Sequence, residues 1–186
     1  MERGFFDLET LKLFSDFPRL SRNQAISKLG MSTACVIGDG KNPTVKTFDE
    51  GEEIALIKHL SKFDTVIGFN IGFDYGVLSP HYGGDMTADF SPKTVDLFEK
   101  IRGTTGAYTK LDEVAGLNLN RAKKLDALEA PRLWAAGEKQ KVRDYCQDDV
   151  DITKELYHYG KKNGKIKVPK KDYAKVIGVE EIATPW

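Results

Sequence analysis

The sequence contains few cysteines and carries no net charge. Only two of its 186 residues are cysteine, Cys35 and Cys146, and both lie among apolar neighbours. Such cysteines are typical of small buried side chains in a reducing compartment, so a disulfide-stabilised secreted domain is not expected. The 28 basic and 28 acidic residues cancel. Because the chain as a whole has no excess charge to attract nucleic acid, any such attraction must be local.

Long apolar runs are also missing. No stretch approaches the roughly 20 apolar residues that cross a bilayer, and residues 1–4 lead into the first apolar segment without room for a signal peptide. We therefore expect a cytoplasmic protein with no membrane association. At 186 residues and 40% hydrophobic content, the chain is long enough for one domain with a sizeable core and short for two. Residues 1–186 are expected to form a single domain.

The first apolar segment, residues 5–10, contains two acids. Its aromatic and aliphatic residues predict a core strand, in which successive side chains point to opposite faces. Asp7 and Glu9 then share one face, and Phe6 and Leu8 share the other. Two neighbouring carboxylates in a partly dry site destabilise a fold unless cations neutralise them, and Mg²⁺ or Mn²⁺ suits oxygen ligands. An Asp-x-Glu pattern is weak by itself, since 28 acids make chance matches common.

The periodicity of the remaining chain predicts an α/β fold in which strands and helices alternate. The expected elements are a β-hairpin over residues 28–39 and 45–49, a helix over 50–63, a buried strand over 66–70 that passes directly into a helix over 71–78, a short strand and helix over 94–101, and helices over 110–119 and 142–159. Two segments are expected to be irregular. Residues 11–22 form a loop or short helix whose exposed residues border the site, and residues 81–92 form a surface loop without assigned chemistry.

The strand that ends at Asn70 places polar residues at the carboxyl edge of the sheet. Asp74 follows in the first turn of the next helix, and open α/β sheets bind ligands at this edge. Asn70 and Asp74 are therefore candidate site residues. The alternative is that Asn70 caps the helix and that Asp74 is an acid favoured by the helix dipole. Asp96 either lies near the site or caps the helix that follows it, and the cap is what we expect.

The helix over residues 142–159 separates its polar and apolar residues onto two faces, with one exception. Asp149 lies near the middle of the apolar face. A core-facing aspartate is rarely structural, which makes it a candidate site residue. Tyr145 lies one turn earlier on the same face, and two side chains four residues apart on a helix can act on one ligand.

Basic residues gather near the end of the sequence. The segment over residues 160–186 contains seven lysines, with Tyr173 among them. It either binds a nucleic-acid backbone or is a solvated segment, and the pattern leaves both interpretations open. Residues 166–168 are expected to add an edge strand, and residues 176–186 to dock onto the domain. Lys124 either reaches phosphate or is an ordinary solvated charge.

Three motifs follow one another along the chain: Asp7-x-Glu9 on the first strand, Asn70-x-x-Phe73-Asp74 after a later strand, and Tyr145-x-x-x-Asp149 on a late helix. With them the chain resembles the DEDD superfamily of 3′-to-5′ exonucleases, in its tyrosine subclass, which has the ribonuclease H-like fold. The nearest group is related to polymerase proofreading domains and occurs alone or attached to helicases. The other subclass has a histidine five residues before the final aspartate, where this chain has Asp144.

This resemblance implies a three-layer α/β fold with a mixed central sheet flanked by helices. It also implies metal-dependent hydrolysis of phosphodiester bonds at single-stranded 3′ ends of DNA or RNA. Two Mg²⁺ or Mn²⁺ ions would activate water and stabilise the leaving oxygen. Asp7, Glu9, Asp74 and Asp149 would hold the ions, and Tyr145 would orient the water or the phosphate. The residues that would bind substrate are Thr10, Asn70, Phe73 and Lys124. The implied partners are nucleic acid and a helicase or another nucleic-acid-processing protein.

Two other functions compete with this one. A non-catalytic ribonuclease H-like module would bind nucleic acid or a protein partner, but such a module would have no need of four buried carboxylates. A junction-resolving endonuclease would use the same metals. The late Tyr-x-x-x-Asp motif favours an exonuclease over it.

Overall fold

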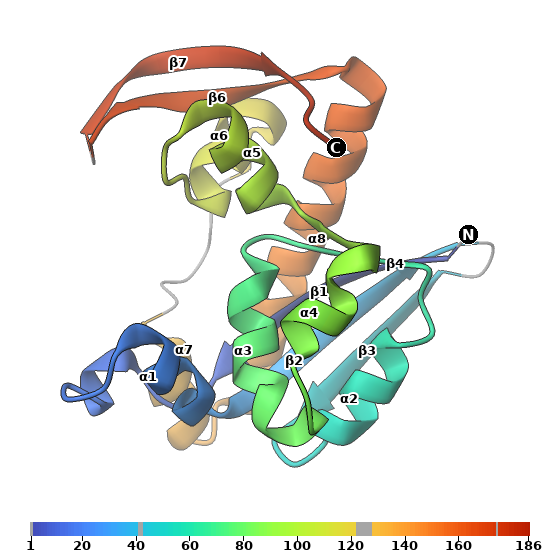
Figure 1. The fold of residues 1–186 in the computed structure, drawn as a ribbon, viewed down its shortest axis with the longest axis vertical. Helices are drawn as coiled ribbons and strands as arrows, with labels where there is room; N and C mark the ends of the chain where they lie inside the picture. Colours follow the sequence, from blue (N-terminus) through green and yellow to red (C-terminus); the bar gives the residue numbers. More distant parts are fainter. Residues whose placement is uncertain (1, 41–42, 122–127, 174) are drawn as a thin grey trace.

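A mixed five-stranded sheet forms the centre of the structure, a computed structural model that describes residues 2–40, 43–121, 128–173 and 175–186 (Figure 1). The sheet consists of β1 (Arg3–Thr10), β2 (Met31–Asp39), β3 (Thr44–Asp49), β4 (Thr65–Gly68) and β5 (Thr94–Asp96), in the spatial order β3-β2-β1-β4-β5. β1 pairs antiparallel with β2 and parallel with β4, and β2 and β3 form the expected hairpin. The first strand of the sequence is therefore the central strand of the sheet.

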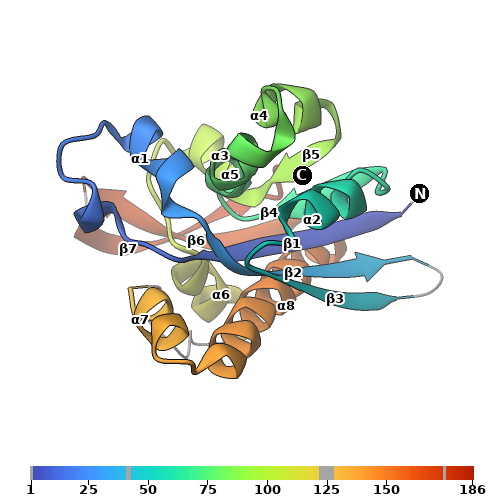
Figure 2. The same ribbon diagram turned by 90° about the horizontal axis from the view of Figure 1, so that it is seen from below.

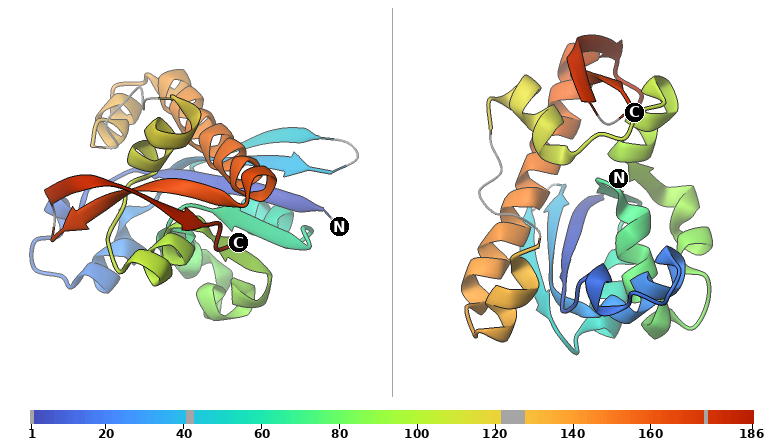
Figure 3. Two further views of the ribbon diagram at one scale, coloured as in Figure 1. Left: turned by 90° about the horizontal axis from the view of Figure 1, so that it is seen from above. Right: turned by 90° about the vertical axis from the view of Figure 1, so that its left-hand side faces the viewer.

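Helices cover both faces of this sheet (Figure 2, Figure 3). One face carries α2 (Glu53–Leu60), α3 (Ile71–Tyr82) and α4 (Met86–Phe90), with α1 (Arg22–Leu29) packed against α3; the other carries α5 (Leu97–Thr105), α6 (Leu111–Leu119) and α8 (Lys139–Asn163). The short helix α7 (Ala130–Ala135) packs against α8, and 3₁₀ turns cover Phe14–Asp16 and Ser91–Lys93. The predicted three-layer α/β architecture with a mixed central sheet is confirmed, and it is consistent with a ribonuclease H-like fold.

The side chains of β1 divide between two cores because neighbouring residues on a strand point to opposite faces. Phe6 and Leu8 belong to the core beneath α2, α3 and α4. Phe5 packs with Cys35 and Cys146 in the core beneath α8, and both cysteines are buried with free thiols, as expected. The odd-numbered residues of β1 therefore face α8.

The polar and apolar faces of α8 lie as the sequence predicts. The helix extends further than expected at both ends, from Lys139 to Asn163. Gly164 ends it with a φ of 69°, a left-handed conformation that glycine adopts without strain. Its buried face packs on β1 and β2, so that it lies across the central strand. Neither α8 nor any other helix in the described ranges is long and apolar enough to span a bilayer.

The prediction of a surface loop over residues 81–92 is wrong. This segment contains the end of α3, all of α4 and a 3₁₀ turn. Met86 and Phe90 are buried in the core, and Asp85 caps α4 by accepting the amide of Ala88 at 3.0 Å. Two apolar residues four positions apart therefore anchor a helix where glycine, serine and proline suggested a loop.

The strand predicted to start at residue 28 begins three residues later, at Met31. The segment before it is α1, whose N-cap Ser21 accepts the amide of Gln24 through its hydroxyl. Gly30 then adopts a φ of 68° and turns the chain into β2. The expected loop or short helix before this point corresponds to the 3₁₀ turn that begins at Phe14.

A second, two-stranded sheet lies outside the central one. β6 (Lys165–Asp172) and β7 (Lys175–Ala183) form an antiparallel hairpin, which packs on α6 and α8 through Ile166 and Val168. The side chain of Asn118 in α6 holds β6 by two hydrogen bonds, to the carbonyl and from the amide of Lys167, at 2.7 and 2.8 Å. Residues 166–168 thus form a strand as predicted, but in a separate sheet and not at an edge of the central one.

The last residues fold back onto α8. The Trp186 indole donates to the carbonyl of Tyr157 at 3.1 Å. Gly160 lies so close to this indole that a β-carbon at position 160 would be 2.7 Å from it. The predicted docking of the C-terminal segment is therefore confirmed for Thr184 to Trp186, whereas most of β7 is exposed.

Candidate metal centre

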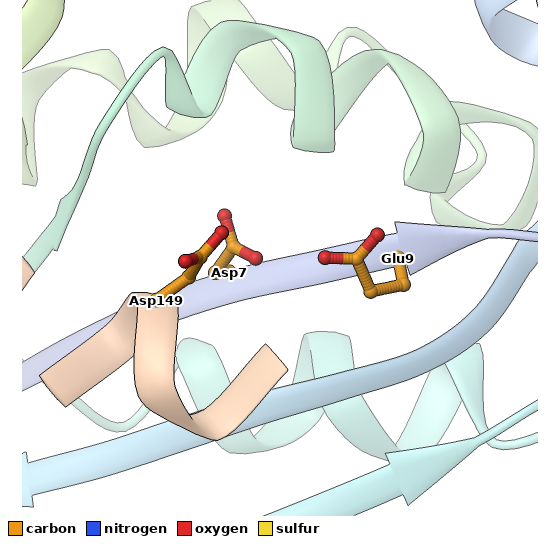
Figure 4. Close-up of side chains that lie close together, drawn as sticks. All are labelled: Asp7, Glu9 and Asp149. Atoms are coloured by element: carbon orange, nitrogen blue, oxygen red, sulfur yellow. The ribbon is translucent and has the colours of Figure 1, made fainter. Parts of the chain in front are cut away.

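Three carboxylates from two elements converge beside the central strand. Asp7 and Glu9 lie on the face of β1 that meets α8, and Asp149 comes from α8. One oxygen of each carboxylate lies within 4.8 Å of the others, and Figure 4 shows the three side chains directed toward a common space. Glu9 and Asp149 are buried and Asp7 is half-buried. The structure thus brings together three of the four acids that the sequence proposes as metal ligands.

Asp149 reaches this space because the face of α8 that carries it is the buried one. Its helical neighbours Cys146 and Val150 belong to the core over β1. The Cys146 thiol contacts the backbone carbonyl of Asp7 at 3.4 Å. Burial raises the pKa of this thiol well above its ordinary value, and the charges of Asp7 and Glu9 raise it further. Cys146 is therefore a neutral packing residue beneath the carboxylates in the metal-free protein.

Asp74 approaches the same place from α3. Because β4 pairs with β1 only as far as Phe5, the amide of Leu8 has no partner in that ladder, and it donates to the Asp74 carboxylate at 3.2 Å. Asp74 is buried, and this burial, together with the negative charge of Asp7, raises its pKa well above the ordinary value. A nearby cation would lower that pKa again. Asp74 lies outside the three-carboxylate cluster, but it lines the same cavity.

Tyr145 lies one turn before Asp149 on the buried face of α8. Burial is the largest influence that raises its pKa above the ordinary value of 10. The charges of Asp149, Glu9 and Asp7 act in the same direction, as does a hydrogen bond with Asp149. The phenol therefore stays protonated at neutral pH, where it can donate a hydrogen bond and cannot act as a base.

All five of these side chains line one cavity of about 560 Å³. Thr10, Asn70 and Phe73, three of the residues expected to bind substrate, line it as well. Asn70 begins α3 in the left-handed region with a φ of 64°, and within the described residues its side chain makes no capping hydrogen bond. Asn70 therefore occupies the N-cap position of α3, but its side chain does not cap the helix. Lys124 lies outside the described residues.

Asp96 has the capping role that we expect from the sequence. Its carboxylate accepts the amides of Phe98 and Glu99 at 3.0 and 3.3 Å and so caps α5. The same oxygen accepts the amide of Asn70 at 2.8 Å. Asp96 therefore also fixes the start of α3, which carries Asp74.

The structure adds residues that the sequence did not single out. Phe14 lines the cavity from the 3₁₀ turn after β1; its ring lies 6.2 Å from that of Phe73, and the Arg22 guanidinium lies over it at 4.7 Å. Lys12 lines the cavity from the same loop, which agrees with the expectation that this loop borders the site. Arg132 lines it from α7, a helix that periodicity did not predict. The sequence contains no motif that points to Arg132.

The donor set fits a hard divalent cation. The clustered atoms are carboxylate oxygens, which Mg²⁺ and Mn²⁺ prefer, and the neighbouring thiol is neutral. Glu9 and Asp149 are buried, so water screens their repulsion poorly. A bound divalent cation would offset this repulsion while facing the cavity. The arrangement is therefore suited to holding metal beside a ligand.

Metal-free protein that carries Asp149→Asn is expected to be more stable than the metal-free wild type. The amide keeps the shape of the side chain and removes one of three clustered negative charges. We expect a gain of about 1–2 kcal/mol in the free energy of unfolding, or roughly 2–8 °C in Tm. Mg²⁺ should raise the Tm of the wild type and have little effect on the variant. Thermal unfolding in EDTA and in Mg²⁺ measures both effects.

Asp144→Asn provides a matched control, because Asp144 is an exposed acid on the polar face of the same helix. The control should unfold like the wild type under both conditions. If Mg²⁺ does not change the Tm of the wild type, and Asp149→Asn is no more stable than the control, then the clustered carboxylates do not repel one another enough to destabilise the fold.

Comparison with known proteins supports the fold. No protein-family model matches the chain, and no curated protein matches it in sequence. Among solved structures, the chain is similar to the family B DNA polymerase from the hyperthermophilic archaeon Pyrobaculum calidifontis, with a TM-score of 0.57 and 18% sequence identity. The similarity covers 85% of this chain and 24% of the polymerase, so the chain spans about a quarter of the polymerase's length. At this level of identity, the similarity concerns the fold alone.

Proposed function

We propose that this chain is a metal-dependent 3′-to-5′ exonuclease of the DEDD superfamily, in its tyrosine subclass. The observation that carries the proposal is that Asp7, Glu9, Asp74, Tyr145 and Asp149 come from three elements and line one cavity. Their motifs resemble those of a group related to polymerase proofreading domains. The similarity in fold to part of a family B DNA polymerase supports the same assignment.

The four acids are the proposed metal ligands. Asp7, Glu9 and Asp149 contribute the clustered oxygens, and Asp74 stands beside them with one oxygen engaged by the amide of Leu8. Two Mg²⁺ or Mn²⁺ ions held there would supply Lewis acidity to the attacking water and to the leaving oxygen. The carboxylates provide the negative charge for binding these cations, and the central strand and α8 fix their positions.

Tyr145 is proposed to orient the reacting groups. Its hydroxyl is protonated and lies beside Asp149 in the cavity lining. From there it can donate a hydrogen bond to a phosphate oxygen or hold the attacking water in line. Its role is therefore positioning by a hydrogen bond at the reacting atoms.

The same cavity carries groups suited to a terminal nucleotide. Phe14 and Phe73 offer aromatic rings on which a base can stack. Arg132 supplies positive charge for a phosphate, and Thr10 and Asn70 offer polar atoms for the sugar. These residues would hold the 3′ end against the acids, which is what removal of single nucleotides from an end requires.

The proposal extends to the setting in which the protein acts. We assign residues 1–186 to a single nuclease domain that works alone or beside another nucleic-acid-processing protein, such as a helicase. A cytoplasmic location fits the two free, buried thiols.

Degradation of 5′-end-labelled single-stranded DNA and RNA tests the proposed activity. With Mg²⁺ or Mn²⁺ we expect a ladder of labelled products that shorten from the 3′ end, and with EDTA no products. A covalently closed single-stranded circle should resist, because an exonuclease requires an end. Metal-dependent cleavage of the circle would indicate an endonuclease, and binding without any degradation would indicate the non-catalytic module.

A further inference from the structure

Positive charge is concentrated in one part of this electrically neutral chain. Residues 160–186 contain seven lysines and three acids, a formal charge of +4, so the remaining residues together carry −4. Five of the seven lysines and all three acids belong to the β6–β7 hairpin, which by itself carries a formal charge of +2. Such segregation creates a local positive potential in a chain whose total charge is zero.

Most of the lysines of the hairpin are exposed. In β6, Lys165 and Lys167 alternate with buried aliphatic residues, because successive side chains on a strand point to opposite faces. Lys170 and Lys175 are exposed near the turn. Lys165 pairs with Glu181 at 2.8 Å, so the hairpin presents the ammonium groups of Lys167, Lys170 and Lys175 to solvent, along β6 and beside the turn. The eight residues of β6 span about 25 Å.

The turn of the hairpin carries Tyr173, which is 99% exposed. Its φ of 52° lies in the left-handed region, which is strained for tyrosine and easier for asparagine or glycine. An aromatic ring that is fully exposed contributes nothing to packing within the chain. Aromatic rings among lysines are the combination with which proteins bind single-stranded nucleic acid, by stacking on bases and pairing with phosphates.

The hairpin is held firmly against the helices below it. The side chain of Asn118 donates to the carbonyl of Lys167 and accepts its amide, as described above. The ammonium of Lys171 pairs with the carboxylate of Glu113 in α6 at 2.7 Å, and its side chain is nearly buried. A binding surface that is fixed in advance loses little conformational entropy when a ligand binds.

The turn of the hairpin and α1 both lie on the left-hand side of Figure 1, Figure 2 and the left panel of Figure 3, although Figure 1 shows the hairpin at the top of the molecule and α1 near the bottom. The carboxyl end of β1 holds Glu9 and Thr10, which line the cavity. A strand of nucleic acid whose 3′ end enters the cavity can therefore reach the hairpin only if it extends along this side of the molecule toward its other end.

We propose that the exposed lysines of the β6–β7 hairpin bind the phosphate backbone of single-stranded nucleic acid, upstream of the 3′ end in the cavity. Lys167, Lys170 and Lys175 contact phosphates, and Tyr173 stacks on a base. The direction of the strand rests on the proposed exonuclease function. Binding of the strand itself does not.

A second copy of the chain is the competing partner for this surface. Val176, Ile177 and Val179 in β7 are about half exposed, and an exposed edge strand can pair with another chain. Two features of the hairpin oppose such pairing, however. The register shifts between Lys170 and Lys171, as at a bulge, and lysines flank the turn. Charge and the exposed tyrosine therefore favour nucleic acid.

Fluorescence anisotropy of a labelled single strand of roughly 16 nucleotides, at the upper end of known site sizes, tests the proposal. The full chain is measured in EDTA, so that hydrolysis cannot occur. In the variant K167Q/K170Q/K175Q, the slope of log K against log salt should fall by about 2, because each phosphate contact contributes about 0.7 for single strands. At low salt, affinity should fall by about tenfold or more.

A control variant, K46Q/K58Q/K62Q, removes the same charge from β3, α2 and the turn after α2, and it should keep the wild-type slope. Equal slopes for the wild type and the hairpin variant would overturn the proposal. It would also be overturned by a wild-type dimer that the hairpin variant dissociates in sedimentation, since the surface would then join two copies. If the salt slope falls in the hairpin variant but the wild type degrades no strand with Mg²⁺ or Mn²⁺, the hairpin site is supported and the exonuclease is rejected. If the wild type degrades the strand but the hairpin variant keeps the wild-type salt slope, the exonuclease is supported and the hairpin site is rejected.

Tyr173→Asn separates stacking from charge. Asparagine adopts the left-handed conformation more easily, so Tm should be unchanged or higher. Affinity for the strand should fall about five- to 150-fold, the loss expected for one stacked base, with the salt slope unchanged. Wild-type affinity in this variant would show that Tyr173 does not stack and would reject that part of the proposal.

Discussion

Asp149→Asn is expected to abolish metal-dependent hydrolysis, with a loss on the order of a thousandfold or more in the rate of the chemical step. Asp149 is buried and shares one space with Asp7 and Glu9. The substitution removes a ligand oxygen and a negative charge while the shape of the side chain is kept. Asp7→Asn should cause a loss of the same order for the same reason. Single-turnover degradation of an end-labelled strand at high metal concentration measures both.

Two controls show whether a loss of activity reflects the metal site. Asp149→Asn should stabilise the metal-free fold, so that lost activity cannot be attributed to unfolding. Asp144→Asn, on the exposed face of the same helix, should retain wild-type rates. Hydrolysis that survives in both Asp149→Asn and Asp7→Asn would mean that the clustered carboxylates are not the catalytic centre.

Tyr145→Phe is expected to slow hydrolysis by about 30- to 1000-fold, because one positioning hydrogen bond in a preorganised site is worth roughly 2–4 kcal/mol in the transition state. The ring remains buried on α8 and only the hydroxyl is lost. Tm and the metal concentration at half-maximal rate should therefore stay close to those of the wild type. A metal titration of the single-turnover rate, together with thermal unfolding, separates these effects.

Tyr159→Phe is the matched control, because Tyr159 lies on the same helix, packs against the core and is not part of the cavity lining. It should leave the rate unchanged. If Tyr145→Phe also hydrolyses at the wild-type rate, the hydroxyl has no part in the mechanism and the acids act without it. If the variant instead requires much more metal, Tyr145 supports metal binding and not the orientation of water or phosphate.

Local periodicity is enough to predict where three of the site acids lie. Alternation along β1 places Asp7 and Glu9 on one face, and the 3.6-residue period of α8 places Asp149 on its buried face. Both rules depend only on neighbours in the sequence. Periodicity predicts only that strands and helices alternate, and the mixed sheet that brings β1 and α8 together is implied by the resemblance of the three motifs to a known family.

The remaining features depend on contacts between distant segments. The hydrogen bond from Leu8 to Asp74 exists because β4 stops pairing with β1 after Phe5, which no local pattern reveals. The pairing of β6 with β7, in place of the central sheet, depends on packing against α6 and α8. Phe14 and Arg132 enter the cavity from a 3₁₀ turn and a six-residue helix, both too short to show a period.

The distance along the chain between β1 and α8 affects when the carboxylate cluster can form during synthesis. From Asp7 to Asp149 the ribosome adds 142 residues, which at about 5–20 residues per second takes roughly 7–28 s. Throughout this interval β1 lacks the helix that covers Phe5 and completes the carboxylate cluster. Until Asp149 has been added and α8 has packed on β1, a nascent chain therefore has no assembled carboxylate cluster.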